Sequence, residues 1–273
     1  MIDEKEIKER IVNGRKFMHM WEEDPDYLTD QQQKKQQPPL TKAPVSEIRI
    51  DLPVNYEDLE MDRDFLHVIN ARKSSRVYTE ENLSLLQLSC LLWCTQGVKE
   101  IRGKSYATLR TVPCGGARHQ FETYLAIQHV EGLKPGYYHY LPMTHQIELL
   151  SENDDMTAMI TDSLCGQRWG AKASVVFYYA CVPYRCEWRY GIYAHRVALI
   201  DSGYISENLY LASTALGLGS CAIGAVNEPV CDPAFGLDGE EEFIFLAHPV
   251  GTVKAEDKQK ELDFYAFVKE QGL

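Results

Sequence analysis

The chain has 273 residues, of which 45% are apolar and 25% charged, a composition typical of a globular protein that buries a full core. Its 40 acidic residues outnumber its 28 basic ones, and the net charge of −12 argues against a nucleic-acid partner, whose phosphates are also negative. No run approaches about eighteen uninterrupted apolar residues, so the sequence predicts no membrane span.

The N-terminal residues and the positions of the cysteines both indicate a protein kept in a reducing compartment. Residues 1–10 are charged throughout and contain no apolar signal region, so we expect a cytoplasmic protein. Most of the 8 cysteines lie inside apolar runs, where reduced and buried thiols are the rule. The closest pairs have the spacings CxxxC and CxxxxC without a histidine cluster nearby, so no metal site is predicted.

The first 51 residues differ in composition from the rest of the chain. Residues 1–23 place apolar side chains roughly at helical spacing, which predicts a helix. Residues 31–39 form a polar, glutamine-rich run closed by two prolines, and such a run buries little surface. We therefore expect an N-terminal helix and an extended arm at residues 1–51, followed by the main domain at residues 52–273.

Four helices are expected in the main domain. They span residues 62–71, 84–97, 154–166 and 193–216. The second begins at a capping box made by Ser84 and Gln87, and Gly217 ends the fourth. Two of them carry an apolar face that we expect to be buried, formed by Phe65, Leu66 and Ile69 in the first helix and by Val197, Ile200, Leu209 and Ala212 in the fourth.

The expected strands alternate irregularly with these helices. They span residues 123–130, 137–140, 146–150, 174–182, 221–226 and 243–250. The second and third face each other across a turn and predict a hairpin, whereas the apolar run at 174–182 predicts a central strand. Because helices and strands mix without strict alternation, the predicted fold class is α+β.

The glycines at 217, 219 and 224 suggest a nucleotide site at first sight. A dinucleotide fingerprint needs its glycines directly after a strand and at the start of a helix, whereas these follow a helix and precede a strand. Two interpretations remain open for this segment. It is either a helix stop with a tight turn, or a place where backbone N–H groups approach a flat ligand.

Two further segments carry candidate binding groups. Residues 72–76 (RKSSR) place two guanidiniums four positions apart with hydroxyls between them, a pattern that can hold a phosphate. The alternative is a solvated helix end, where cations meet the negative end of the helix dipole. Residues 113–117 (PCGGA) form a second glycine-rich turn, which by itself predicts only a loop.

Taken together and in this order, these segments resemble the FMN-dependent nitroreductase family. Within it they resemble the branch of thiazole- and oxazole-forming (azoline) dehydrogenases and their stand-alone relatives. The matching motifs lie at residues 72–76, 88–97, 110–116, 136–140, 190–196, 217–224 and 249–251. The resemblance covers roughly residues 38–253 and implies a nitroreductase-like fold, with a central mixed or antiparallel sheet flanked by helices. It also implies an interlocked homodimer with FMN at the subunit interface.

The resemblance also implies roles for individual residues. The ribityl phosphate should be held by Arg72, Ser74 and Arg76, with Lys260 as an extra basic contact from the C-terminal tail. Pro113, Cys114 and Gly115 should line the flavin ring of the other subunit's site. Ala222, Ile223 and Gly224 should lie along the ring, with the Gly224 N–H near the flavin N5, and Gln167 should bond the pyrimidine edge.

Two positions depart from the pattern of the branch. Cys114 stands where serine is usual, and Arg189-Tyr190 replaces the Lys-Tyr pair of the azole-forming dehydrogenases. An arginine stays protonated and cannot act as a base, which puts azoline oxidation in doubt, whereas Tyr190 could still pass a proton. Arg189 and Tyr190 are therefore the candidate catalytic residues.

The expected function is that of an FMN-dependent oxidoreductase. NAD(P)H would reduce the bound FMN, which would pass its electrons in a ping-pong reaction to a small-molecule acceptor, namely a nitroaromatic, quinone or enone. One alternative is a dehydrogenase that oxidises a peptide heterocycle. Another is a flavin-binding module without turnover.

Overall fold

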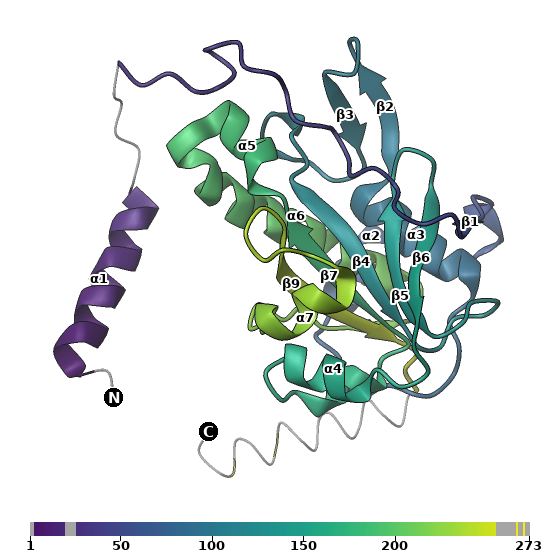
Figure 1. The fold of residues 1–273 in the computed structure, drawn as a ribbon. Helices are drawn as coiled ribbons and strands as arrows, with labels where there is room; N and C mark the ends of the chain where they lie inside the picture. Colours follow the sequence, from purple (N-terminus) through teal and green to yellow (C-terminus); the bar gives the residue numbers. More distant parts are fainter. Residues whose placement is uncertain (1–2, 20–25, 255–265, 267–269, 271–273) are drawn as a thin grey trace.

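A seven-stranded sheet forms the centre of the structure, a computed structural model that describes residues 3–19, 26–254, 266 and 270 (Figure 1). The strand order is β1-β6-β5-β4-β7-β9-β8, and each neighbouring pair is antiparallel. The strands are β1 (Arg49–Asp51), β4 (Phe121–Ile127), β5 (Gly136–Leu141), β6 (Gln146–Glu152), β7 (Val175–Cys181), β8 (Gly219–Ser220) and β9 (Phe243–Gly251). A separate hairpin is formed by β2 (Val98–Arg102) and β3 (Ala107–Arg110). The α+β class with an antiparallel central sheet is confirmed.

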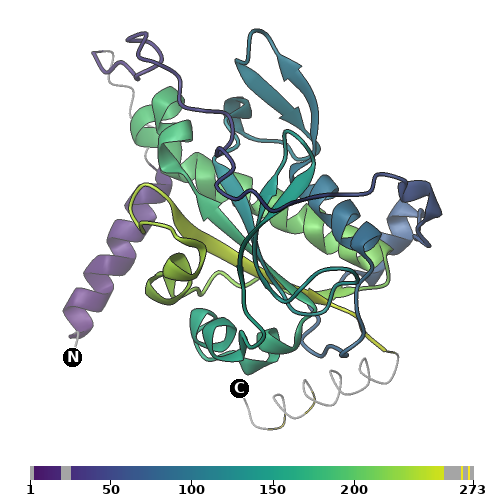
Figure 2. The ribbon, with the colours of Figure 1, turned by 45° about the vertical axis from the view of Figure 1, so that its right-hand side comes forward.

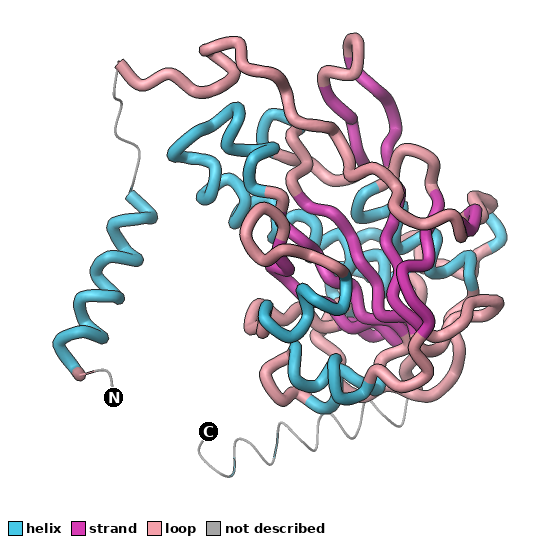
Figure 3. Tube along the Cα trace, in the orientation of Figure 1, coloured by secondary structure: helices cyan, strands magenta, loops and turns pink. Residues whose placement is uncertain are grey.

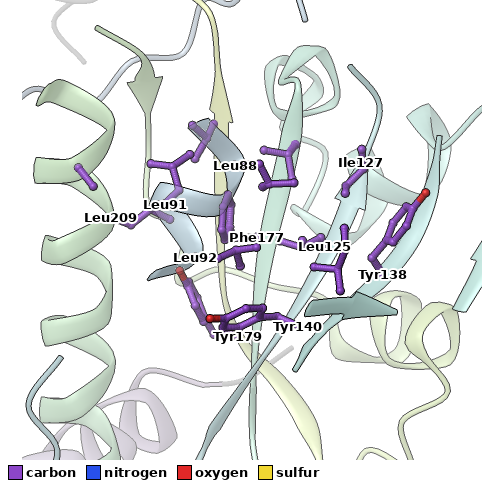
Figure 4. Packing of buried hydrophobic residues seen from close by; sticks show 14 of the residues in the cluster. Leu88, Leu91, Leu92, Leu125, Ile127, Tyr138, Tyr140, Phe177, Tyr179 and Leu209 are labelled. Carbon is purple, nitrogen blue, oxygen red and sulfur yellow. The ribbon is translucent and has the colours of Figure 1, made fainter. Parts of the chain in front are cut away.

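Helices cover both faces of this sheet. Helices α3 (Leu85–Gln96) and α6 (Ala194–Ala215) pack on one face, and α4 (Thr157–Ser163) and α7 (Glu228–Phe235) on the other. Successive side chains of a strand point to opposite faces, so Phe177 and Tyr179 of β7 join the leucines of α3, as Figure 4 shows, while Tyr178 packs with α4 and α7. Helix α6 has buried residues along its whole length, from Ala194 to Ser213.

The N-terminal part of the chain lies outside these layers. Helix α1 (Glu4–His19) extends away from the sheet in Figures 1 and 2, but Phe17 near its C-terminal end lines a pocket with residues of α5, α6 and β9. Residues 26–48 are loop and turn, as Figure 3 shows, and they run past α5 (Pro183–Tyr190) toward β1. No helix in the described ranges is long and apolar enough to cross a lipid bilayer.

The arm is bonded to a buried ionic network on the sheet. The Lys42 N–H donates to Glu122 at 2.6 Å, and the Val45 N–H donates to Glu148 at 2.8 Å. Glu122 is 1% exposed and forms an ion pair with the buried Arg185 of α5. His139 lies between the two glutamates, with Nδ1 2.8 Å from Glu148. The arm is extended as expected, but its backbone is tied to buried charges that the sequence pattern did not indicate.

All four predicted helices are present, but the apolar faces predicted for two of them are only partly buried or exposed. In α2 (Phe65–Ala71) the buried residue is Val68, whereas Phe65 and Leu66 are 67% and 70% exposed. In α6 Ile200 is 48% exposed, while Leu209 and Ala212 are buried as expected. Periodicity identifies an apolar face but cannot say whether the chain itself supplies a partner for it.

The strands differ from expectation mainly near the C-terminus. Residues 221–226 are not a strand: β8 lies earlier, at Gly219–Ser220, and Ile223 makes only an isolated bridge with Ala247. The predicted hairpin and the strands at β4, β7 and β9 are confirmed within a few residues. Sequence patterns missed β1, the β2–β3 hairpin, α5 and α7, which are short or rich in charged residues.

Candidate functional site

The basic segment at 72–76 and the glycine-rich segment at 219–224 lie side by side. The Ser75 N–H donates to the Ser220 carbonyl at 2.8 Å, and Ser74 and Ser220 form a parallel bridge. Gly219 permits this approach, because a Cβ there would lie 2.7 Å from the Ser75 Cβ. The structure thus brings together two of the segments that the resemblance assigns to FMN.

Tyr210 of α6 connects these two segments. Its hydroxyl lies 2.9 Å from Ser74 Oγ and accepts a hydrogen bond from the Ala222 N–H at 2.8 Å. Tyr210 was not among the residues predicted from the sequence. The sequence feature that could have identified it is a polar side chain one residue after Leu209, at the border of the buried face of α6.

The two arginines of the basic segment rest on aromatic rings. The Arg72 guanidinium lies 5.1 Å from the centre of the Tyr210 ring, and that of Arg76 lies 5.7 Å from the Trp169 ring. Gln167 lies two residues before Trp169, and its amide donates to the Leu164 carbonyl at 3.1 Å. Lys260 lies outside the described residues.

The residues along the glycine-rich segment differ in exposure. Ile223 is buried in the core and exchanges both backbone hydrogen bonds with Ala247. Gly224 is exposed, and a Cβ built on it would meet no atom within 4 Å. An open backbone at Gly224 and two guanidiniums in the segment that pairs with Ser220 fit a flat anionic group such as FMN in shape and charge.

A second group of candidate residues surrounds the turn at 113–117. The Gly115 N–H donates to Asp201 of α6 at 3.1 Å, and Gln120 Nε2 donates to the same carboxylate at 3.0 Å. Asp201 is only 2% exposed. The sequence analysis missed this residue, although an acid four positions from both Val197 and Ile205 on a buried helix face was a readable signal. Asp201 fixes the conformation of the turn.

Cys114 also bonds to Asp201. Its Sγ lies 3.1 Å from Oδ2, and burial together with the neighbouring carboxylate raises the pKa of the thiol to about 12. Cys114 therefore stays protonated at neutral pH and donates a hydrogen bond, as the serine usual at this position would.

This assignment predicts a low reactivity for Cys114. A pKa raised from 9.0 to about 12 reduces the thiolate fraction about a thousandfold. With limiting iodoacetamide at neutral pH, the exposed Cys165 should be alkylated long before Cys114. Peptide mass spectrometry over time measures both in one sample. Rapid labelling of Cys114 in the folded protein would contradict the assignment.

Arg189 and Tyr190 end α5 against the same turn. A Cβ on Gly116 would lie 2.4 Å from Arg189 Nε and 2.8 Å from the Tyr190 hydroxyl, so both side chains face the glycine backbone. Gly116 also has a φ of 56°, which favours glycine. The structure thus brings the two candidate catalytic residues together with Cys114 and Gly115, while Pro113 is exposed beside them.

The two groups of residues are apart within one chain. Asp201 holds the turn at 113–117 and Tyr210 holds the segment at 72–76, and these side chains are nine residues apart on α6. At about 1.5 Å per residue this separation is about 13 Å along the helix axis. We refer to them as the ring turn (residues 113–117, with Arg189 and Tyr190) and the phosphate cradle (residues 72–76 and 219–224).

The helix-covered antiparallel sheet, the basic cradle and the second glycine turn are the features expected of a nitroreductase-like oxidoreductase. Comparison with known proteins agrees, since the sequence model of the nitroreductase family matches residues 69–252, more than half of the chain. The chain belongs to the nitroreductase family. Membership confirms the predicted class of enzyme, an FMN-dependent oxidoreductase.

Individual relatives are similar in sequence. The protein MJ1384 of Methanocaldococcus jannaschii, described as a nitroreductase, is 30% identical over 204 residues, which are 75% of this chain and 96% of that protein. The trifolitoxin-processing protein TfxB of Rhizobium leguminosarum bv. trifolii is 29% identical over 133 residues, which are 47% of this chain and 36% of TfxB.

Solved structures show the same fold. A Ralstonia eutropha protein described as a nitroreductase superimposes with a TM-score of 0.62 at 26% identity and covers 81% of this chain and 97% of its own. The E. coli microcin synthetase McbBCD complex includes a chain with a TM-score of 0.56 at 18% identity, covering 91% of this chain and 92% of its own. At that identity the second likeness shows the fold alone.

Proposed function

We propose that this protein passes electrons from NAD(P)H through FMN to a nitroaromatic, quinone or enone acceptor. The observation that carries the proposal is the phosphate cradle. In it the Tyr210 hydroxyl forms hydrogen bonds with Ser74 and with the Ala222 N–H. The guanidiniums of Arg72 and Arg76 lie on the rings of Tyr210 and Trp169. FMN supplies the hydride and electron chemistry when bound, and the protein supplies orientation and charge.

The residues of the phosphate cradle and of the ring turn would have different roles in this reaction. Arg72, Ser74 and Arg76 would hold the phosphate, and the open Gly224 backbone would face the ring. Tyr190 would supply a proton to the acceptor, and Arg189, which stays protonated, would bind the acceptor's oxygen. Asp201 acts indirectly, because it positions the Gly115 N–H.

Rapid reduction of bound flavin is the test of this proposal. We expect NADH or NADPH to abolish the visible flavin absorbance in an anaerobic stopped-flow experiment, and a nitroaromatic or quinone to restore it. If neither nicotinamide reduces FMN that is stoichiometrically bound, the protein is a flavin-binding module rather than a reductase of this kind.

We further propose that the working form is a homodimer, in which the ring turn of one subunit completes the cradle of the other. Exposed apolar residues lie on the surfaces of α2 and α6 and on the turn before α6, namely Phe65, Leu66, Ile192, Leu199, Ile200 and Tyr204. Helices α2 and α6 contact each other, so Phe65 and Leu66 of α2 can form one patch with Ile200 and Tyr204, which are one turn apart on α6. An apolar patch of this kind is typical of a protein interface.

A charge placed in this patch should separate the subunits. Ile200→Glu should convert the dimer to a monomer and weaken FMN binding at least tenfold, since an unpaired charge in an interface costs several kcal/mol. Light scattering and FMN titration measure the two effects. Ile101→Glu makes the same change at an exposed residue of β2 and serves as the control. A variant at 200 that stays dimeric would contradict this placement of the interface.

A second candidate function is the oxidation of a peptide heterocycle, favoured by the similarity to the trifolitoxin-processing protein. The residue before Tyr190 argues against it, because Arg189 cannot take up a proton. Reduction of the bound flavin by an azoline-containing peptide, which is oxidised to the azole, followed by reoxidation of the flavin by oxygen, would favour this function over the reductase.

A further inference from the structure

The N-terminal arm is fixed against the end of α5 that carries Arg189 and Tyr190. The Gln31 N–H donates to the Trp188 carbonyl at 2.8 Å, and Trp188 Nε1 donates to the Lys35 carbonyl at 3.1 Å. The Ile192 N–H donates to the Tyr27 hydroxyl at 3.2 Å. Figure 1 shows the arm passing α5 toward the β2–β3 hairpin. We call residues 26–37 the arm clamp.

The arm clamp and the β2–β3 hairpin together hold the guanidinium of Arg189. Arg189 Nη1 donates to Gln31 Oε1 at 3.1 Å and to the Tyr106 hydroxyl at 2.8 Å. Gln31 Nε2 donates to the same hydroxyl at 2.9 Å, which closes a triangle of hydrogen bonds. Three segments far apart in sequence thus meet at one guanidinium.

The other side of this guanidinium faces the ring turn. Arg189 Nε is buried next to Gly116 and has no hydrogen-bond partner among the residues that the structure describes. Because the triangle occupies Nη1, the planar group cannot turn away from the glycine backbone. A buried donor without a partner is costly, and a ligand that accepts its hydrogen bond would remove that cost.

The charge around the ring turn is locally positive although the chain is acidic. Arg118 is 3% exposed and donates to the carbonyls of Gly116 and Tyr106, at 3.0 and 2.9 Å. Within the described ranges, no carboxylate forms an ion pair with Arg118 or Arg189. The nearby carboxylates are engaged elsewhere: Asp201 with the Gly115 N–H, and Asp30 with Lys35.

We propose that the arm clamp is the outer wall of the substrate site, and that Gln31 and Tyr106 position Arg189 so that the site selects electron acceptors carrying a carboxylate. This inference rests on the proposed oxidoreductase function and names the class of its acceptor. Two guanidiniums without carboxylate partners attract an anion, and a fixed guanidinium matches a carboxylate in shape and charge. Arg189 is the specificity-determining residue, and Gln31 and Tyr106 are positioning residues.

The test compares two ligands that differ only in charge. FMN-loaded protein is titrated with benzoate and with benzamide, and binding is followed by the change in absorption of the oxidised flavin, so that no turnover is needed. Benzoate should bind at least about tenfold more tightly, since a charge-assisted bond is worth about 1.5 kcal/mol or more. Arg189→Gln should abolish this preference, and Arg189→Lys should retain part of it.

Variants of the positioning residues separate the proposal from a general loss of structure. Gln31→Ala and Tyr106→Phe should each reduce the preference for benzoate about threefold or more, while benzamide affinity stays the same. Thr144→Ala changes an exposed polar residue in the turn between β5 and β6, outside the arm clamp, and should leave both affinities unchanged. Because benzamide reports the integrity of the pocket, the ratio of the two affinities isolates the effect of charge.

Three results would overturn the inference. The first is equal affinity for the two ligands in the wild type. The second is an unchanged preference in Arg189→Gln, and the third is a preference retained in both Gln31→Ala and Tyr106→Phe. If Arg189→Gln lowers the flavin reduction potential while the preference persists, the guanidinium serves the flavin instead. Flavin that NAD(P)H reduces without any preference for benzoate refutes this inference alone, whereas protein that takes up no FMN refutes the proposed function and this inference with it.

Discussion

Arg76→Ala should weaken FMN binding by about ten- to a hundred-fold and leave riboflavin binding nearly unchanged. The reason is the phosphate, which riboflavin lacks and which a guanidinium binds with a charge-assisted bond worth about 1.5–3 kcal/mol. Each 1.4 kcal/mol is about tenfold in affinity. Quenching of flavin fluorescence on addition of apoprotein measures both ligands under the same conditions.

The neighbouring Lys73 provides the matched control. Lys73→Ala removes the same charge from the same segment, but its side chain is exposed, whereas those of Arg72 and Arg76 rest on aromatic rings. It should therefore change FMN affinity much less. Since Arg76 also packs on Trp169, a merely destabilised fold would lose FMN and riboflavin alike. Equal losses of affinity for FMN and riboflavin would show that the cradle does not bind the phosphate.

Arg185→Ala should lower the free energy of unfolding by about 3–5 kcal/mol, because it leaves Glu122 charged, buried and without its main partner. The same change should loosen the arm, since Glu122 also accepts the Lys42 N–H. Urea denaturation followed by circular dichroism measures the stability, and limited proteolysis reports whether residues 26–48 become accessible.

Two further variants identify the cause of this loss. Arg185→Met combined with Glu122→Gln removes both charges of the pair and should restore part of the stability, because Glu122 is then no longer a buried carboxylate without its partner. Lys134→Ala breaks the exposed ion pair with Glu152 and should leave stability nearly unchanged. If the double variant is no more stable than Arg185→Ala, the loss of stability comes from packing and not from the unpaired charge.

The buried network also predicts how stability depends on pH. Burial alone would raise the pKa of Glu122, but Arg185 and His139 lower it below its ordinary value of 4.5. This stabilisation is therefore present above about pH 4.5 and is lost as the pH falls further. The pKa of His139 is raised by Glu122 and Glu148 in spite of burial, so its stabilisation is present below about pH 6.5 and is lost at higher pH.

Much of the fold could be predicted from the sequence, because those elements depend on local interactions. The capping box of Ser84 and Gln87 begins α3 as expected, with both of its hydrogen bonds. The hairpin of β5 and β6 and the apolar run of β7 follow from turn residues and apolar patterns within short windows. The order of the motifs was also sufficient to indicate the family.

The candidate site could be predicted only as separate segments. The motifs indicated residues 72–76, 113–117, 189–190 and 222–224, but no local pattern showed which segments lie together. Asp201 and Tyr210 decide that, and each does so by hydrogen bonds to residues more than ten positions away in sequence. These two residues were missed, because helical periodicity treats a buried polar residue as an exception and does not name its partner.

The tertiary structure alone decided the role of the arm and of the exposed apolar faces. The polar composition of residues 31–37 predicted little burial, yet Gln31 bonds Arg189 and Tyr106 because an amide can satisfy a guanidinium and a hydroxyl at once. Phe65, Leu66 and Ile200 have the spacing of core residues and remain exposed, because nothing else in the described chain covers them. Spacing along a chain determines which side chains share a face, whereas the packing of distant segments determines what that face meets.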